Sequence, residues 1–346
     1  ETPRPSHQTS DRQLTQSPAG SCSSTVMDNS PANHPPMEFK DRQTGLIVFG
    51  ILEILLGCLC ALLVPLMIWG QAMSAQATGG APNFRMAIPG ALVYAMLAVA
   101  LVWLGIGSMR FRRWARALLL ILSWSWLGMG VIAMGFLLVW SPKMMVSLPP
   151  DAKTVALVVA AVIWTLIFIV VPGVLVVFYQ SKHVKATCEA RDPVARWTDG
   201  CPLPVLAVAV WLGFGAAWML AMPIALNVVL PFFGVLLSGL SATAACLLLS
   251  VLWACLAWAW YRLKPAAWWI TLAILLAFSI SSILTFTQVD VMEMYRLMGY
   301  PPEQMALMEQ YSFLTGQTMV WWSAGFMLLM IGYVIWVKRF FRRALE

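Results

Sequence analysis

Eight apolar stretches, each about long enough to cross a lipid bilayer, account for most of this 346-residue chain. A hydrocarbon core about 30 Å thick requires about 20 apolar residues in helical form. The run Val155–Ile163 lacks the alternation of apolar and polar residues that a membrane β-barrel needs. The sequence therefore predicts an all-α integral membrane protein with eight transmembrane helices. The helices are expected at residues 45–69, 86–109, 117–140, 154–180, 203–226, 233–261, 266–288 and 317–337.

The composition agrees with a membrane protein that has a polar N-terminal tail. Hydrophobic residues make up 60% of the chain and charged residues 11%, whereas soluble domains carry about 25% charged residues. Residues 1–36 are rich in Ser, Pro, Gln and Asn. This composition predicts that residues 1–44 form a disordered cytoplasmic tail. Met37 lies just before the first expected helix and is a candidate start of translation. The alternative is that residues 1–36 belong to the native protein.

The basic residues predict the orientation of the helices, because cytoplasmic loops collect Lys and Arg. Eighteen of them lie in the N-terminal tail, in the C-terminal tail 338–346, or in the gaps after the second, fourth and sixth expected helices. Both termini and the linker 181–202 are therefore expected in the cytoplasm, and the protein in the bacterial inner (cytoplasmic) membrane. The basic residues on the opposite side are Arg85, Lys143, Lys153 and Arg296.

The two halves of the chain resemble each other when the sequence is shifted. A shift of 152 residues places Arg110 on Arg262, Arg112 on Lys264, Pro149 on Pro301, Pro150 on Pro302, and Asp151 on Glu303. A shift of 158 residues places Gly57 on Gly215 and Pro65 on Pro223. We interpret residues 45–180 and 203–337 as a parallel duplication of a four-helix unit. The alternative is chance agreement among residues that are common in membrane helices.

Glu53 is the one acidic residue that falls inside the expected helices. A carboxyl group at that depth is costly and marks a candidate functional site. Gly50 and Gly57 share its helix face, and small residues beside a polar group allow a second helix to approach closely. Two roles remain open: the carboxyl group joins two helices, or it exchanges protons during transport. The second half has Trp211 at the matching position.

The seventh expected helix carries a stripe of hydroxyl groups. Ser279, Ser282 and Thr285 are spaced three residues apart, and such hydroxyls either bond to helix backbone or line a substrate path. The outer segment 289–316 is expected to form a short amphipathic helix broken at Pro301–Pro302. Its methionines favour a pliable apolar face over a copper site, and this segment caps the bundle or meets a partner.

Missing motifs narrow the function. The three histidines, His7, His34 and His183, lie outside the expected helices, and the chain has no HExxH, GxxxxGK[ST] or GxGxxG motif. We therefore expect no enzyme, no cofactor, no metal and no catalytic residue. The basic segments are too short to predict nucleic-acid binding. The expected partners are the lipid bilayer and a membrane protein or second copy of the chain. The sequence favours a non-enzymatic scaffold or accessory subunit of a membrane complex; the alternative is a small proton-coupled transporter or channel that uses Glu53.

Overall fold

Eight apolar helices dominate the structure, a computed structural model that describes residues 40–78, 84–144, 149–225, 227–300, 305–306, 309 and 316–343. It is 87% helical. Within the described residues, eight helices are long and apolar enough to cross a membrane, which confirms that part of the prediction. Their apolar spans are Gln43–Met73, Ala87–Met109, Arg113–Val139, Asp151–Gln180, Leu203–Pro223, Gly239–Tyr261, Pro265–Gln288 and Gly316–Phe341.

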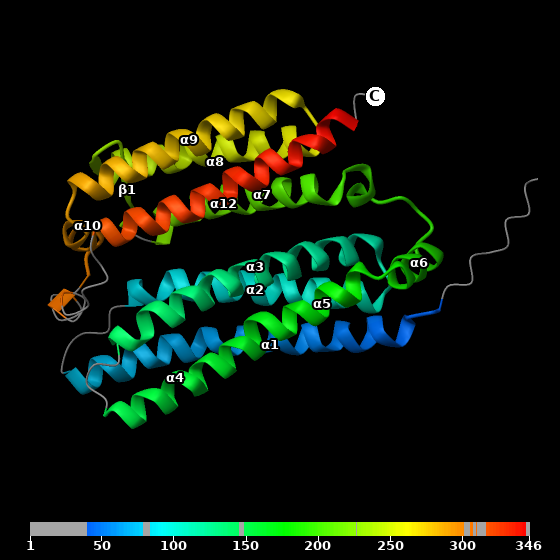
Figure 1. The fold of residues 1–346 in the computed structure, drawn as a ribbon, viewed down its shortest axis with the longest axis horizontal. Helices are drawn as coiled ribbons and strands as arrows, with labels where there is room; N and C mark the ends of the chain where they lie inside the picture. The colour runs from blue at the N-terminus through cyan, green and yellow to red at the C-terminus, as the bar shows by residue number, and fades with distance from the viewer. Residues whose placement is uncertain are drawn as a thin grey trace, which may run out of the picture. The chain divides into compact units, whose positions relative to one another are not determined.

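The first half forms two pairs of packed helices. The first helix packs along the second, and the third packs along the fourth, which is interrupted (Figure 1). The first helix begins two residues earlier than the sequence predicted, and residues 1–39 of the expected tail lie outside the described residues. The elements are α1 (Gln43–Thr78), α2 (Phe84–Met109), α3 (Arg113–Met144), α4 (Pro150–Thr165), the π-helical turn η1 (Leu166–Val170) and α5 (Val171–Gln180).

The π-helical turn between α4 and α5 has a local cause. Pro172 has no N–H with which to bond the carbonyl group of Phe168, four residues earlier. The N–H of Val171 instead donates to the carbonyl oxygen of Leu166, five residues earlier, as in a π-helix. The freed carbonyl oxygen of Phe168 comes so close to Gly130 of α3 that a Cβ atom at that position would overlap it. The turn therefore lets α3 approach the interrupted fourth helix, which consists of α4, η1 and α5, closely.

The linker folds against the end of the helices where Arg110, Arg112 and Arg113 lie, the Arg-rich end. It contains α6 (Lys182–Arg191) and the short 3-10 helix η2 (Trp197–Gly200). Arg191 donates a hydrogen bond to Gln43 at the start of α1, and the Tyr261 hydroxyl at the end of α8 donates to the carbonyl oxygen of Trp197. The segment that the sequence predicted as a polar connection is thus an ordered element that contacts both halves.

The second half repeats the pairing of the first, since α7 packs along α8 and α9 along α12. The helix that was expected over 233–261 begins at residue 239, because residues 229–238 form an antiparallel hairpin with the two-residue turn Phe233-Gly234. That part of the prediction was wrong. The elements are α7 (Leu203–Ala225), β1 (Val229–Phe232), β2 (Val235–Ser238), α8 (Gly239–Tyr261), α9 (Pro265–Gln288), α10 (Val291–Met298) and α12 (Gly316–Arg343).

Two terminal boundaries also differ from the expectation. The outer helix α10 ends at Met298, where Gly299 adopts the left-handed conformation with φ +82°, so a glycine cap ends it before the prolines are reached. Pro301 and Pro302 lie outside the described residues. The basic segment expected as a tail from residue 338 continues α12 as far as Arg343.

The turn after α2 and the turn after α8 have the same geometry, in the register of the 152-residue shift. Phe111 and Leu263 both have positive φ angles, 56° and 54°. The residue after each, Arg112 or Lys264, donates its backbone N–H to the carbonyl oxygen five residues earlier, at 3.0 Å in both turns. This is the Schellman arrangement, which usually has glycine in the left-handed position. Bulky residues seldom adopt that conformation.

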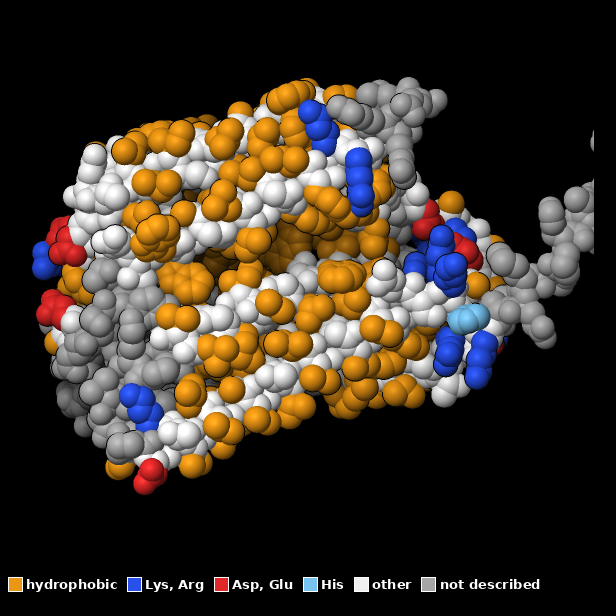
Figure 2. All heavy atoms as spheres, in the orientation of Figure 1, with side chains coloured by type: hydrophobic (Ala, Val, Ile, Leu, Met, Phe, Trp, Pro, Cys, Tyr) orange, Lys and Arg blue, Asp and Glu red, His pale blue; other side chains and the backbone are white. Residues whose placement is uncertain are grey.

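Charged side chains collect at the ends of the helices, and apolar side chains cover the surface between them in the face that Figure 2 shows. Val177 of α5 and Leu240 of α8 are 74% and 86% exposed. Exposed apolar surface of this extent is typical of helices that contact lipid or another protein.

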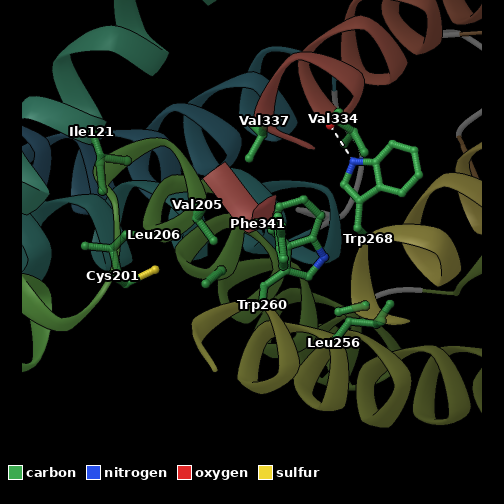
Figure 3. Close-up of a cluster of buried hydrophobic side chains, with 12 residues drawn as sticks. Ile121, Cys201, Val205, Leu206, Leu256, Trp260, Trp268, Val334, Val337 and Phe341 are labelled. Atoms are coloured by element: carbon green, nitrogen blue, oxygen red, sulfur yellow. Dashed lines mark hydrogen bonds between the residues drawn. The ribbon is translucent and has the colours of Figure 1, made fainter. Parts of the chain in front are cut away.

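The largest buried cluster lies in the second half, near the Arg-rich end (Figure 3). Trp260 of α8 and Trp268 of α9 are buried there, and the Trp268 indole donates to the carbonyl oxygen of Val334 in α12 at 2.7 Å. Ile121 of α3 joins the same cluster. The Trp211 indole of α7 also donates to the Ser125 hydroxyl of α3 at 2.8 Å. The two halves therefore share a packed contact along α3 and α7.

Candidate functional site

Glu53 lies inside the first half, where α1, α2 and α5 meet. Its side chain is 3% exposed. Its Oε1 atom lies 2.9 Å from the hydroxyl oxygen of Tyr179 in α5, which lies 2.9 Å from the hydroxyl oxygen of Ser108 in α2. The Ser108 hydroxyl donates to the carbonyl oxygen of Leu46 in α1 at 3.1 Å. Tyr179, Ser108 and Leu46 are all at most 2% exposed, so this row of oxygen atoms is sealed from solvent.

Small residues bring α1 and α2 together around Glu53. A Cβ atom at Gly50 would lie 2.8 Å from the carbonyl oxygen of Gly105, and one at Gly105 would lie 2.7 Å from the carbonyl oxygen of Gly50. Two turns further along α1, a Cβ atom at Gly57 would lie 3.0 Å from the carbonyl oxygen of Ala98. The two backbones are therefore in direct contact on the helix face that carries Glu53, as small residues allow in membrane helices.

Counting protons shows which form of Glu53 fits this row of contacts. The three contacts need three protons, and the carbonyl group of Leu46 has none to donate. If Glu53 is ionised, Tyr179 donates to it, and one of the two Ser108 contacts is left without a proton. If Glu53 is protonated, it donates to Tyr179, Tyr179 donates to Ser108, and Ser108 donates to Leu46. The geometry therefore fits a neutral carboxyl group, which also avoids burying an unpaired charge.

Two features of this network bear on its chemistry. The donor chain ends at the backbone carbonyl group of Leu46, which has no proton to pass on. At the other end, Glu53 Oε2 is buried and has no hydrogen-bond partner among the described residues. The first feature favours a fixed connection between helices, and the second leaves one acceptor open.

The hydroxyl groups of α9 make different contacts. Ser279 donates to the carbonyl oxygen of Leu275 in its own helix at 2.8 Å, and Ser282 is partly buried. Thr285 is buried and accepts the backbone N–H of Gly234 at 3.0 Å, while Ser281 accepts that of Phe233 at 2.9 Å. The structure thus brings Thr285 together with Ser281, which the sequence analysis missed. The pair holds the turn of the β1–β2 hairpin.

Sequence reasoning also missed Tyr179 and Ser108, the partners of Glu53. Each lies one residue before the end of its helix, whereas Glu53 lies ten residues inside α1. A buried carboxyl group requires a nearby hydrogen-bond partner, but no sequence signal paired these two residues with Glu53.

A second polar cluster fixes the linker to α3. Asp192, at the end of α6, is 3% exposed and accepts two hydrogen bonds from the Arg196 guanidinium, at 2.8 and 3.1 Å. Arg112 forms an ion pair with it at 3.4 Å, and the backbone N–H of Arg113 donates to it at 3.4 Å. The hydrogen bonds from Arg196 and Arg113 lower the pKa of Asp192, although burial acts in the opposite direction.

We expect Asp192→Asn to loosen the linker, with a loss of about 1–3 kcal/mol because hydrogen bonds to a charged group are lost. Because the pKa of Asp192 is lowered by folding, its contribution is present above the unfolded pKa, about 3.9, and is lost as the pH falls through the folded value. The difference in melting temperature between wild type and variant should therefore be largest at neutral pH and should shrink as the pH falls.

Alkylation of Cys188 provides a local check on the same prediction. This thiol lies in α6, is 1% exposed, and has its pKa raised to about 11 by burial, so it should react slowly in the folded protein. Mass spectrometry should find it labelled faster in Asp192→Asn than in Lys185→Gln, which alters an exposed i,i+4 ion pair on the same helix. Equal labelling in the two variants would contradict the assigned role of Asp192.

Among the grooves on the surface of the described residues, two apolar ones stand out, and neither includes Glu53. The larger, of about 560 Å³, runs between α1 and α5 to the start of α6 and includes Arg42 and Ser181. The smaller, of about 390 Å³, lies between α7 and α8 beside Trp197. Within the described residues, no group of three or more His, Cys, Asp or Glu side chains is placed to hold a metal ion.

Comparison with known proteins found no matching family model, no matching curated protein and no matching solved structure.

Proposed function

We propose that this chain is a non-enzymatic scaffold or accessory subunit of a complex in the bacterial inner membrane. The observation that carries the proposal is that polar side chains among its described helices bond to their own helix, to a neighbouring helix or to the hairpin. The Glu53–Tyr179–Ser108 network connects α1, α2 and α5. Ser281 and Thr285 bond to the hairpin turn. A bundle whose polar groups are used internally, and whose outer face is apolar, is suited to packing against other membrane proteins.

The proposed orientation places both termini and the linker in the cytoplasm. The Arg-rich turns, α6 and the start of α1 contact one another at one end of the helices, and the positive-inside rule assigns that end to the cytoplasm. We further propose that the halves arose by parallel duplication. The matching turns at Phe111 and Leu263 and the matching order of helix pairs support this.

The second candidate is a small proton-coupled transporter or channel that uses Glu53. The unpaired Oε2 atom of Glu53 favours it, because a buried acceptor without a partner is unusual. In that case the hydrogen bonds between Glu53, Tyr179 and Ser108 would rearrange during transport, and Glu53 would gain and lose its proton.

Two measurements on the same preparation separate the candidates. The protein is extracted gently from its native membrane and sized by light scattering, then reconstituted into vesicles that enclose a pH-sensitive dye. The scaffold predicts an assembly larger than the single 38.3 kDa chain, and proton flux equal in wild type, Glu53→Gln and protein-free vesicles. A monomer whose proton flux is abolished by Glu53→Gln would refute the scaffold and establish the transporter.

A further inference from the structure

The groove between α1 and α5 is lined mainly by apolar side chains and has polar residues at one end. Its wall on α5 is apolar and includes Val174 and Val177, and Phe49 of α1 also lines it. From Ile169 to Ser181 the groove follows twelve residues of helix, which corresponds to about 18 Å along the helix axis. This length suits an acyl chain that lies parallel to the helices.

The polar end of the groove carries a positive charge without a partner. Arg42 lines this end and is exposed, and no carboxylate lies within ion-pair distance of its guanidinium among the residues that the structure describes. Its backbone N–H donates to Thr187, which fixes the start of α1 against α6. The Ser181 hydroxyl lines the same end and does not cap α6. A cation and a hydroxyl group at the end of an apolar groove match a phosphate attached to acyl chains.

Two aromatic rings that line the groove pack closely against each other, and the space beside them is open. The rings of Phe49 and Phe178 pack with their centroids 4.4 Å apart. Beside them on α5, a Cβ atom at Gly173 would meet nothing within 4 Å. Gly173 therefore keeps the groove open without being needed for helix contact, and a large side chain there would fill the groove and leave the fold unstrained.

We propose that this groove binds an anionic glycerophospholipid in the leaflet at the Arg-rich end, with its phosphate at Arg42 and Ser181 and an acyl chain along Val174 and Val177. The proposal rests on the insertion of the helices into a bilayer and is independent of the scaffold role. Failure of lipid binding in a protein that still incorporates into nanodiscs would therefore remove the lipid site alone.

The test titrates delipidated protein in neutral detergent with phosphatidylglycerol, and native mass spectrometry counts the bound molecules. We expect one molecule to bind more tightly than phosphatidylcholine with the same chains. Arg42→Ala should weaken this binding about fivefold, the effect of one basic residue near an anionic headgroup. Arg339→Ala, which removes another cation near the same end, should leave it unchanged.

A second pair of variants tests the apolar part of the site. Gly173→Phe should prevent lipid binding by filling the groove, whereas Gly215→Phe should not, although its Cβ atom on α7 also meets nothing within 4 Å. The proposal is overturned if Arg42→Ala and Arg339→Ala act alike, if phosphatidylcholine binds as tightly, or if inorganic phosphate displaces the lipid. If Gly173→Phe does not fold, the two arginine variants decide.

Discussion

Replacing Gly50 with leucine should destabilise the protein by about 3 kcal/mol, because the side chain has no room between α1 and α2. The Cβ atom alone would lie 2.8 Å from the backbone carbonyl oxygen of Gly105 and 2.7 Å from Cγ of Met109. Met109 can adjust, but the backbone of Gly105 can move only if the helices separate. Separation would also stretch the hydrogen bonds of Ser108 in α2 to Leu46 and Tyr179.

Gly70→Leu is the matched control for this prediction. Gly70 lies on the same helix, and a Cβ atom there would meet nothing within 4 Å. Both substitutions gain the same helix propensity, so the comparison isolates the contact between the helices. Unfolding in a denaturing detergent titration should show a large loss for Gly50→Leu and almost none for Gly70→Leu. Equal stabilities would mean that α1 and α2 do not make the close approach described.

Glu53→Ala should cost about 2–3 kcal/mol, through the lost hydrogen bond and the cavity it leaves. Glu53→Gln should cost less than about 1 kcal/mol, because the Gln amide can donate to Tyr179 and keep every hydroxyl contact supplied with a proton. The difference between the two variants follows from the hydrogen bond and the side-chain volume that Gln keeps and Ala loses. A loss as large for Gln as for Ala would contradict the hydrogen-bonding role assigned to Glu53.

A double-mutant cycle with Tyr179→Phe measures the Glu53–Tyr179 contact itself. Hydrogen bonds between membrane helices contribute about 0.6 kcal/mol on average and at most about 1.7 kcal/mol. We expect a coupling energy near the upper value, because the contact is sealed from solvent and continues to Ser108. Strictly additive effects of the two substitutions would show that this contact does not join the helices.

The sequence could predict the long helices because their signal is strong and local. An apolar run such as Val155–Ile163 has few alternatives in lipid, where backbone groups must bond within a helix. The hairpin at 229–238 was missed because its residues are as apolar as the helix that follows. Only the turn residues distinguish it, since both Phe233 and Gly234 have positive φ angles, as a two-residue hairpin turn of this kind requires.

The sequence predicted only some residues of the candidate site. Glu53 was found because an acidic residue is rare at that depth, and Gly50 because small residues mark close helix contacts. Tyr179 lies 126 residues away along the chain, and no local pattern connects two such positions. On α9, a spacing of three selected Ser279 and Ser282, whereas the hairpin turn is bonded by Ser281 and Thr285, four residues apart on one helix face.

Infrared spectroscopy of the protein in lipid nanodiscs tests most directly whether Glu53 is a fixed structural donor. The carbonyl band of a protonated carboxylic acid should be present in the wild type throughout the physiological pH range and absent from Glu53→Gln. A carboxylate band that reversibly replaces it as the pH rises through neutrality would contradict the account, because that is the behaviour of a carboxyl group that carries protons.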